Sequence, residues 1–121
     1  KKRLAGIMLG MALSAGCSKE VELSFVECLV EDGVHGYNAW WCGACRMQEK
    51  NLEEELGEYW QPFKEQVLIE CYEPGETLIR KEICRDKKIT FYPAWEFHQG
   101  TEWKRGALSL SELSEYSGCG Y

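Results

Sequence analysis

The sequence predicts a single α/β domain, in which a strand–helix–strand unit is followed by a β-hairpin and a final helix. Its 121 residues are enough for one domain and too few for two. Hydrophobic residues make up 45% and charged residues 28%, a balance typical of a soluble globular core. Apolar residues recur at helical spacing in some segments and form short extended runs in others, and the order of these segments predicts the fold class.

The first half of the chain predicts a helix, a strand and a second, longer helix. Phe25 and Leu29 lie near one face of a helix over residues 21–31, which Gly33 closes. Residues 34–41 are rich in Val, Tyr and Trp and favour an extended strand. From Cys42 onward, apolar residues at helical spacing among Glu and Lys predict a long helix. These residues are Met47, Leu52, Leu56 and Tyr59, and Pro62 lies just beyond them.

The second half predicts three further strands, one of them interrupted by Pro93, and two helices. Residues 66–72 look like a buried strand that the turn residues Pro74 and Gly75 bound. Thr77 could cap a short helix that ends at Arg85. Strands are expected on both sides of Pro93 and again after the turn at Gln99 and Gly100, over residues 90–92, 94–98 and 101–104. Ser109 and Glu112 have the spacing of a capping box, which starts the terminal helix.

Charge and cysteine content narrow the function classes. The net charge of −6 argues against a nucleic-acid surface, since phosphate binding needs clustered Lys and Arg. Seven cysteines are unusual in a reducing cytosol, where disulfides do not persist. Three cations at residues 1–3 precede an apolar run over residues 4–13, too short to cross a bilayer core of roughly 30 Å. This combination predicts an exported protein with a signal peptide.

The apolar run ends in Leu13-Ser14-Ala15-Gly16-Cys17. This segment resembles the lipobox of bacterial lipoproteins, in which small residues precede a cysteine that becomes lipid-modified. The resemblance implies a signal peptide over residues 1–16, a lipid on Cys17, a tether over residues 17–20 and a folded domain over residues 21–121. The protein would then be a membrane-anchored lipoprotein on the periplasmic or cell-surface side. An ordinary signal peptide with an incidental cysteine is the alternative.

Cys42 and Cys45 carry the strongest chemical signal. They are separated by Gly43 and Ala44, at the point where the expected first strand gives way to the long helix. A helix N-terminus has unpaired N–H groups and a partial positive charge, which favour a thiolate. We expect Cys42 to attack a client disulfide and Cys45, one turn on, to resolve the mixed disulfide. No organic cofactor is needed, because the thiols carry the electrons.

Two metal-binding interpretations compete with redox chemistry. A structural zinc site needs four ligands, and neither Cys71 with Cys84 nor His35 with His98 offers the spacing of a second ligand pair. A copper metallochaperone could use the two thiols of the Cys42 motif and His98, because soft thiolates suit Cu(I). We expect no metal site, and copper binding is the weaker alternative.

The motif surroundings resemble one family over about residues 25–121. The matching segments are residues 25–29, 36–42, 69–71, 92–97, 109–113 and 117–119. They resemble the thioredoxin-like domain that is fused to, or partners, bacterial homologues of vitamin K epoxide reductase. The resemblance implies a thioredoxin fold, with a central mixed sheet flanked by helices and a cis-proline, Pro93, before the C-terminal hairpin.

The resemblance also implies roles for individual residues and partners. Trp41, Tyr92 and Pro93 would form the substrate groove, and the backbone of Tyr92 would receive a client peptide by strand-like hydrogen bonding. The partners would be proteins with thiols or disulfides and a separate quinone-linked membrane oxidoreductase. Thioredoxin has a buried Asp six residues before its first active-site cysteine, where this chain has Gly36. Glu70, on the neighbouring strand, is a candidate substitute as proton acceptor.

Four cysteines remain once Cys17 and the reactive pair are set aside. We prefer the pairs Cys71 with Cys84 and Cys28 with Cys119, although four cysteines permit three connectivities. The second pair would tie the two ends of the domain together. A second redox relay through Cys71 and Cys84 is the alternative to a structural role.

The sequence therefore predicts a thiol–disulfide oxidoreductase that acts on exported proteins or on a membrane redox partner. An extracytoplasmic reductase or isomerase of secreted or cytochrome-maturation substrates is an alternative within the same fold. A non-catalytic scaffold lipoprotein is an alternative from another class. The direction of electron flow does not follow from the sequence, because it depends on the reduction potential of the Cys42–Cys45 pair.

Overall fold

The computed structural model describes residues 17–121, and side chains from residue 24 onward. The expected signal peptide, residues 1–16, lies outside the described residues. The elements are α1 (Cys17–Asp32), β1 (His35–Asn38), α2 (Gly43–Leu56), the 3-10 helix η1 (Gly57–Tyr59), α3 (Trp60–Val67), β2 (Leu68–Glu70), α4 (Glu82–Asp86), β3 (Ala94–Phe97), β4 (Glu102–Arg105) and α5 (Leu110–Ser117). No helix within this described part is long and apolar enough to cross a bilayer.

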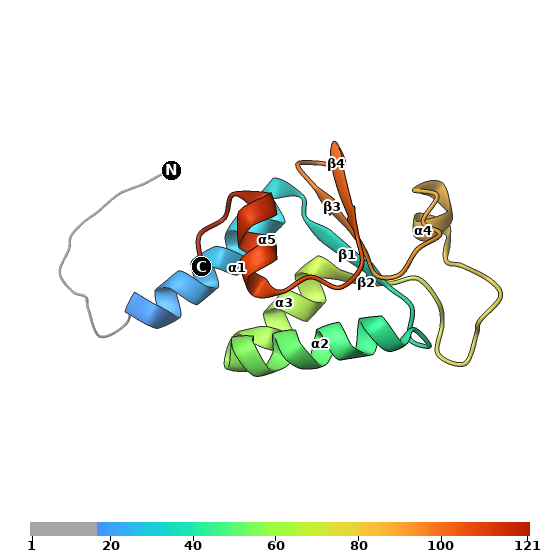
Figure 1. Cartoon of the computed structure of the whole chain (residues 1–121), viewed down its shortest axis with the longest axis horizontal. Coiled ribbons are helices and arrows are strands. Elements are labelled where there is room, and N and C mark those ends of the chain that lie inside the picture. The colour runs from blue at the N-terminus through green and yellow to red at the C-terminus, as the bar shows by residue number, and fades with distance from the viewer. Residues whose placement is uncertain (1–16) are drawn as a thin grey trace.

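The strands form one mixed sheet in the order β2-β1-β3-β4. Strands β1 and β2 are parallel, and the helices between them make the crossover connection that a parallel pair requires. Strand β3 is antiparallel to both β1 and β4, so β3 and β4 form the C-terminal hairpin. The fold is therefore the α/β class that the sequence predicts, with a four-stranded mixed sheet flanked by helices (Figure 1).

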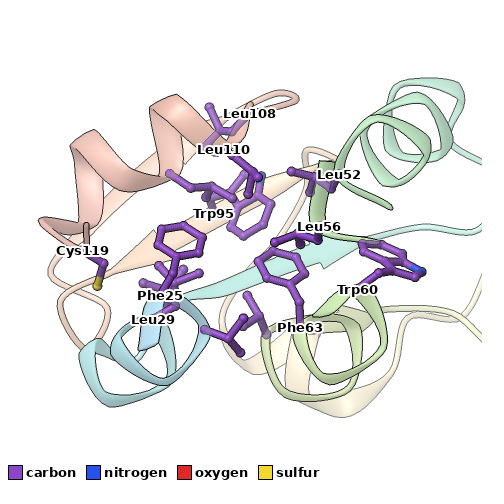
Figure 2. Close-up of a cluster of buried hydrophobic side chains, with 14 of the residues drawn as sticks. Phe25, Leu29, Leu52, Leu56, Trp60, Phe63, Trp95, Leu108, Leu110 and Cys119 are labelled. Carbon is purple, nitrogen blue, oxygen red and sulfur yellow. The ribbon is translucent and has the colours of Figure 1, made fainter. Parts of the chain in front are cut away.

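The main hydrophobic core lies between one face of the sheet and helices α1, α2, α3 and α5. Phe25 and Leu29 of α1, Phe63 of α3 and Leu113 of α5 are completely or almost completely buried in it. Trp95 of β3 enters the same cluster from the sheet (Figure 2). Strand side chains alternate between faces, so the neighbours of Trp95 point to the opposite side.

A second, smaller cluster covers part of the opposite sheet face. Its members are Tyr37, Ala39, Cys71, Tyr72, Cys84, Ile89 and Ala94, with Cys42, Ile69 and Tyr92 packed against them. Strands β1 and β3 contribute Tyr37 and Ala94, and the rest comes from the segments that connect the strands. This cluster therefore joins the sheet to the segment that carries Cys42.

The long helix departs from the expected pattern in two ways. Met47 is 62% exposed and Gln48 is buried instead, where its Oε1 accepts hydrogen bonds from Trp95 Nε1 at 2.9 Å and Leu108 N at 2.8 Å. The long helix ends at Leu56, before Tyr59, and Pro62 lies beyond it, within the first turn of a further helix, α3. The first N–H groups of a helix have no partner within it, so a proline there loses no hydrogen bond. Helix α3 runs to Val67, and this leaves β2 shorter than the strand expected over residues 66–72.

Three other expected boundaries are wrong. The helix expected from Thr77 begins at Glu82, because the carboxylate of Glu76 binds the N–H groups of Leu78 and Ile79 and holds this segment as a loop. Residues 90–92 form no strand, and bends occupy residues 91–93. Residues 17–20, expected as a tether, are helical, since they contain no Gly or Pro that would stop α1. The capping box of Ser109 and Glu112 is present, as predicted.

Candidate active site

Cys42 is the N-cap residue of α2, and its sulfur lies at the start of the helix. Its backbone is extended, with φ −84° and ψ 121°, and its N–H donates to Ala39 O at 2.9 Å. The Sγ of Cys42 accepts the N–H of Cys45 at 3.1 Å and lies 3.5 Å from Tyr92 O. The helix therefore directs the N–H group of Cys45 and the positive end of the helix dipole at this sulfur.

Cys45 lies one turn into α2 and differs sharply from Cys42 in exposure. Both thiols are free, but Cys42 is partly exposed and Cys45 is only 1% exposed. Burial raises the pKa of Cys45, and the hydrogen bond with Cys42 and the charge of Glu49 raise it further, whereas the backbone of Ala39 lowers it. The two sulfurs therefore suit different steps: Cys42 can meet an external disulfide, and Cys45 can reach only Cys42.

Three aromatic rings pack together beside the segment that carries Cys42. Trp41 lies edge-on to Tyr72 and Tyr92, with ring centroids 5.4 and 5.8 Å away, and the two tyrosine rings are 5.8 Å apart. Trp41 remains 39% exposed. An edge-to-face arrangement of this kind gives a firm apolar rim beside Cys42, against which an incoming chain could pack.

Pro93 follows Tyr92 at the base of the hairpin. The Tyr92–Pro93 peptide bond is cis. Pro93 O accepts the N–H of Gly106 at 2.8 Å, which fixes this segment to the end of β4. Of the residues expected to form the groove, Trp41 and Tyr92 thus contact each other, and the carbonyl of Tyr92 faces the sulfur of Cys42.

Gly36 is required by packing and not by the chemistry of the site. A Cβ at this position would lie 2.6 Å from the Trp95 ring, closer than any side chain allows. A carboxylate at residue 36 would therefore need the ring of Trp95 to move out of the core.

Glu70 holds the backbone of the site. Its Oε2 accepts the N–H groups of Trp40 at 2.9 Å and Tyr72 at 3.2 Å, so it joins the segment before Cys42 to the loop after β2. Burial raises the pKa of Glu70, and these two N–H groups oppose the rise. The carboxylate that acts electrostatically on Cys45 is Glu49.

Glu49 and Asn38 are site residues that the sequence analysis missed. Asn38 Nδ2 donates to Glu49 Oε2 at 2.9 Å, and Asn38 is only 2% exposed. Both line a cavity of about 120 Å³, together with Lys64 and Glu70. The spacing of four between Cys45 and Glu49 was the available signal, because residues at this spacing share one face of a helix.

The remaining four cysteines form two disulfides in the combination that we preferred from the sequence. Cys28 and Cys119 are joined with Cα atoms 5.8 Å apart, and Cys71 and Cys84 with Cα atoms 5.7 Å apart. Cys71 and Cys84 are completely buried. An external thiolate therefore has no direct access to this second disulfide. Cys17 begins α1, and nothing is described of its side chain.

The two histidines lie apart from the cysteine pair in contacts of their own. His35 Nδ1 is 3.5 Å from Glu96 Oε1, and His98 Nδ1 is 2.8 Å from Asp32 Oδ1. His98 stands at the far end of β3 from Pro93, roughly 16 Å along an extended chain. Within residues 17–121, no group of three His, Cys, Asp or Glu side chains could hold a metal ion. His98 is therefore not placed as a third copper ligand.

Neither known protein-family models nor curated protein sequences give a significant match to this chain.

Proposed function

We propose that the chain is a thiol–disulfide oxidoreductase with a thioredoxin fold. The observation that supports this most is the position of Cys42: a partly exposed sulfur at the N-cap of α2, 3.1 Å from Cys45 N, with the buried thiol of Cys45 one turn on. The mixed sheet, the C-terminal hairpin and the cis bond before Pro93 support the fold assignment.

The proposed reaction is a pair of disulfide exchanges. The Cys42 thiolate attacks one sulfur of a client disulfide, and the other client sulfur leaves as a thiolate. The Cys45 thiolate then attacks Cys42 Sγ, which releases the client as a dithiol and leaves a Cys42–Cys45 disulfide. In the reverse direction, a client dithiol gives two electrons to the Cys42–Cys45 disulfide. The client becomes a disulfide, and Cys42 and Cys45 return to thiols. No proton or electron is left over in either direction once the released thiolates are protonated.

The rim beside Cys42 is the proposed client groove. A client strand laid along Tyr92 and Pro93 would bring its cysteine to Cys42, and Trp41 would exclude water from the exchanging sulfurs. The complete burial of Cys71 and Cys84 favours a structural disulfide over a relay. The family resemblance extends the proposal to a partner, a quinone-linked membrane oxidoreductase that resets the Cys42–Cys45 pair.

The proposed location is the outer side of a bacterial membrane, with a lipid on Cys17. Intact-mass measurement of the protein from its native membrane tests this part independently of the redox chemistry. A mass that corresponds to a chain beginning at Cys17 with attached acyl groups supports it. A chain that begins elsewhere, or that carries no lipid, contradicts it.

The reduction potential of the Cys42–Cys45 pair tests the function and its alternative together. Equilibration with glutathione buffers, followed by alkylation and mass spectrometry, gives the fraction of disulfide at each potential. A reduction potential of about −120 mV favours an oxidase, and one of about −270 mV favours the reductase or isomerase alternative. A pair that forms no reversible disulfide contradicts both. Full cellular function in a Cys42→Ala strain would instead support the scaffold alternative.

A further inference from the structure

One side of the molecule combines exposed apolar side chains with most of the positive charge of the described chain. We call it the basic–apolar surface and define it as residues 76–91 with Trp103 and Arg105. Its exposed apolar residues are Leu78, Ile79, Ile83, Phe91 and Trp103, with exposures of 89%, 66%, 45%, 53% and 40%. These are half of the large hydrophobic residues that stand exposed in the described part of the chain. A concentration of this kind marks an interaction site.

The charge of this surface is opposite to that of the protein as a whole. Five cations, Arg80, Lys81, Arg85, Lys87 and Lys88, stand within nine residues, against two acidic residues, Glu82 and Asp86. The whole chain has a net charge of −6. Positive charge is therefore concentrated in this segment, although Lys81 also pairs with Glu73 at 3.6 Å, and Arg80 and Arg85 donate to backbone carbonyls within the segment.

The apolar tip is held in place by the fold. Glu76 Oε2 accepts the N–H groups of Leu78 at 2.7 Å and Ile79 at 3.0 Å, and Glu76 O accepts Trp40 Nε1–H at 2.9 Å. The Cys71–Cys84 disulfide closes the base of the loop. Figure 1 shows this loop projecting past the sheet, on the side away from α1 and α5. Leu78 and Ile79 thus project from a fixed backbone, and nothing in the described chain covers them.

A hollow continues the surface toward the sheet. It has a volume of about 250 Å³ and is lined by Lys87, Lys88, Phe91, Trp103 and Arg105, among others. The guanidinium of Arg105 lies 4.5 Å from the centroid of the Phe91 ring. Lys87 also pairs with the buried Glu96 at 3.2 Å. Cations beside aromatic rings are the combination found where proteins meet the headgroup region of a membrane.

We propose that the basic–apolar surface docks on an anionic lipid surface, with Leu78 and Ile79 in the headgroup layer and the surrounding cations on lipid phosphates. Charge complementarity selects an anionic partner. The projecting tip favours a lipid surface over a folded protein, because Leu78, which is 89% exposed on a single loop, can enter a headgroup layer while the cations beside it stay at the phosphates. The proposal does not depend on the redox function, although Trp40 joins the same loop to the Cys42 segment.

Hydrogen exchange on the full chain with vesicles tests the proposal locally. A local readout is needed because residues 4–13 are apolar in sequence and can bind lipid themselves. The vesicles contain phosphatidylcholine alone or with about one third phosphatidylglycerol. We expect slower exchange at the backbone amides of residues 77–81 with the anionic vesicles only, and loss of this protection in high salt. Inorganic phosphate at the same total phosphate concentration should have no effect.

Two variants and a control separate the apolar and charge contributions. The double variant Leu78→Ser with Ile79→Ser, and the double variant Lys81→Glu with Lys88→Glu, should each raise the lipid concentration needed for half-protection at least about tenfold. Met47→Ser, which removes a 62% exposed apolar side chain from α2, should leave it unchanged. Circular dichroism confirms that each variant is folded.

Three results would overturn the proposal. They are no protection of residues 77–81 by anionic vesicles, equal protection by neutral vesicles, and an equal loss in the Met47→Ser control. Protection of the same amides by a soluble acidic polypeptide such as polyglutamate, without any by vesicles, would also overturn it and would favour a protein partner.

Discussion

Cys42 and Cys45 belong to the same helical turn, yet their surroundings differ in ways that suit them to the two different roles proposed above. Cys42 lies at the helix start with its sulfur beside Tyr92 O, whereas Cys45 is buried and its pKa is raised. A buried thiol with a raised pKa resists attack on external disulfides and reacts only when Cys42 brings a disulfide to it. The difference in burial therefore supports the proposed division of roles between the two sulfurs.

The charge of Glu49 adds to the raised pKa of Cys45, after the larger effect of burial. Glu49 raises the pKa of Cys45, so Glu49→Gln should lower that pKa and increase the thiolate fraction at any pH below it. We expect the release of a mixed disulfide at neutral pH to become about twofold faster or more. Stopped-flow measurement of glutathione release from the Cys42 adduct, across a range of pH, tests this.

Glu53→Gln is the matched control for that experiment, because Glu53 is an exposed carboxylate further along α2. It should leave the release rate unchanged. A slower release in Glu49→Gln would contradict the electrostatic account and would identify Glu49 as the acceptor of the Cys45 proton.

At the residue scale, the candidate site residues that belong to a local motif could be named from the sequence alone. The spacing of Cys42 and Cys45 is readable without a structure, and the family resemblance supplied Trp41, Tyr92 and Pro93. Asn38 and Glu49 were not found, because their hydrogen bond joins a strand to a helix and depends on how these two elements pack. The backbone role of Glu70 was missed for the same reason, since its partners lie in two separate loops.

Among the elements, β1 and β3 pack so closely that Gly36 has no space for a side chain. The Trp95 ring covers Gly36 in the neighbouring strand, and Trp95 Nε1 donates to the buried Gln48 of α2. This arrangement fixes the spacing between the sheet and the helix that carries Cys42. A side chain at residue 36 would disturb all three elements together.

Gly36→Ala should therefore destabilise the protein, although the same change in an open position stabilises. The added Cβ would lie 2.6 Å from the Trp95 ring, and overpacking of this kind costs about 1–3 kcal/mol. Gly43→Ala is the control, because a Cβ there meets nothing within 4 Å and alanine is the better helix former. Urea unfolding gives both free energies. An equal or greater stability for Gly36→Ala would show that the sheet and α2 can move apart easily.

Element order was predictable from periodicity and turn residues, and element boundaries were less so. The capping box at Ser109 and Glu112 gave the start of α5, because its hydrogen bonds are local. The short helix expected from Thr77 starts only at Glu82, since Glu76 and the Cys71–Cys84 disulfide hold residues 77–81 as a loop by contacts that periodicity does not record. Gln48, and not Met47, is buried because it binds Trp95 and Leu108. Periodicity could not show this, since both partners are distant from Gln48 in sequence.

At the scale of the whole molecule, the two ends of the described chain are joined to each other. The Cys28–Cys119 disulfide links α1 to the segment after α5, across a sequence separation of 91. Phe25 and Tyr121 pack edge-to-face beside it, with ring centroids 5.1 Å apart. Helix α1 is thus part of the domain's core, and the main cluster includes Cys119 (Figure 2).

Removal of this disulfide should cost more stability than removal of the other one. On the chain-entropy model, a loop of this length stabilises by about 4–5 kcal/mol, and the 13-residue separation of Cys71 and Cys84 by about 3 kcal/mol. Paired alanine variants, Cys28→Ala with Cys119→Ala and Cys71→Ala with Cys84→Ala, can be compared by guanidinium unfolding. A larger loss for the second pair would place the stability of the molecule in the loop beside Cys42.

The most direct measurement of the central claim is the fate of a mixed disulfide at Cys42. The native chain and the Cys45→Ala variant, each with the reactive pair reduced, are mixed with oxidised glutathione and followed by intact and peptide mass spectrometry. The account predicts one stable glutathione on Cys42 in Cys45→Ala, and in the native chain a transient adduct that gives way to a Cys42–Cys45 disulfide. No adduct at Cys42, or an adduct that persists unchanged in the native chain, would contradict it.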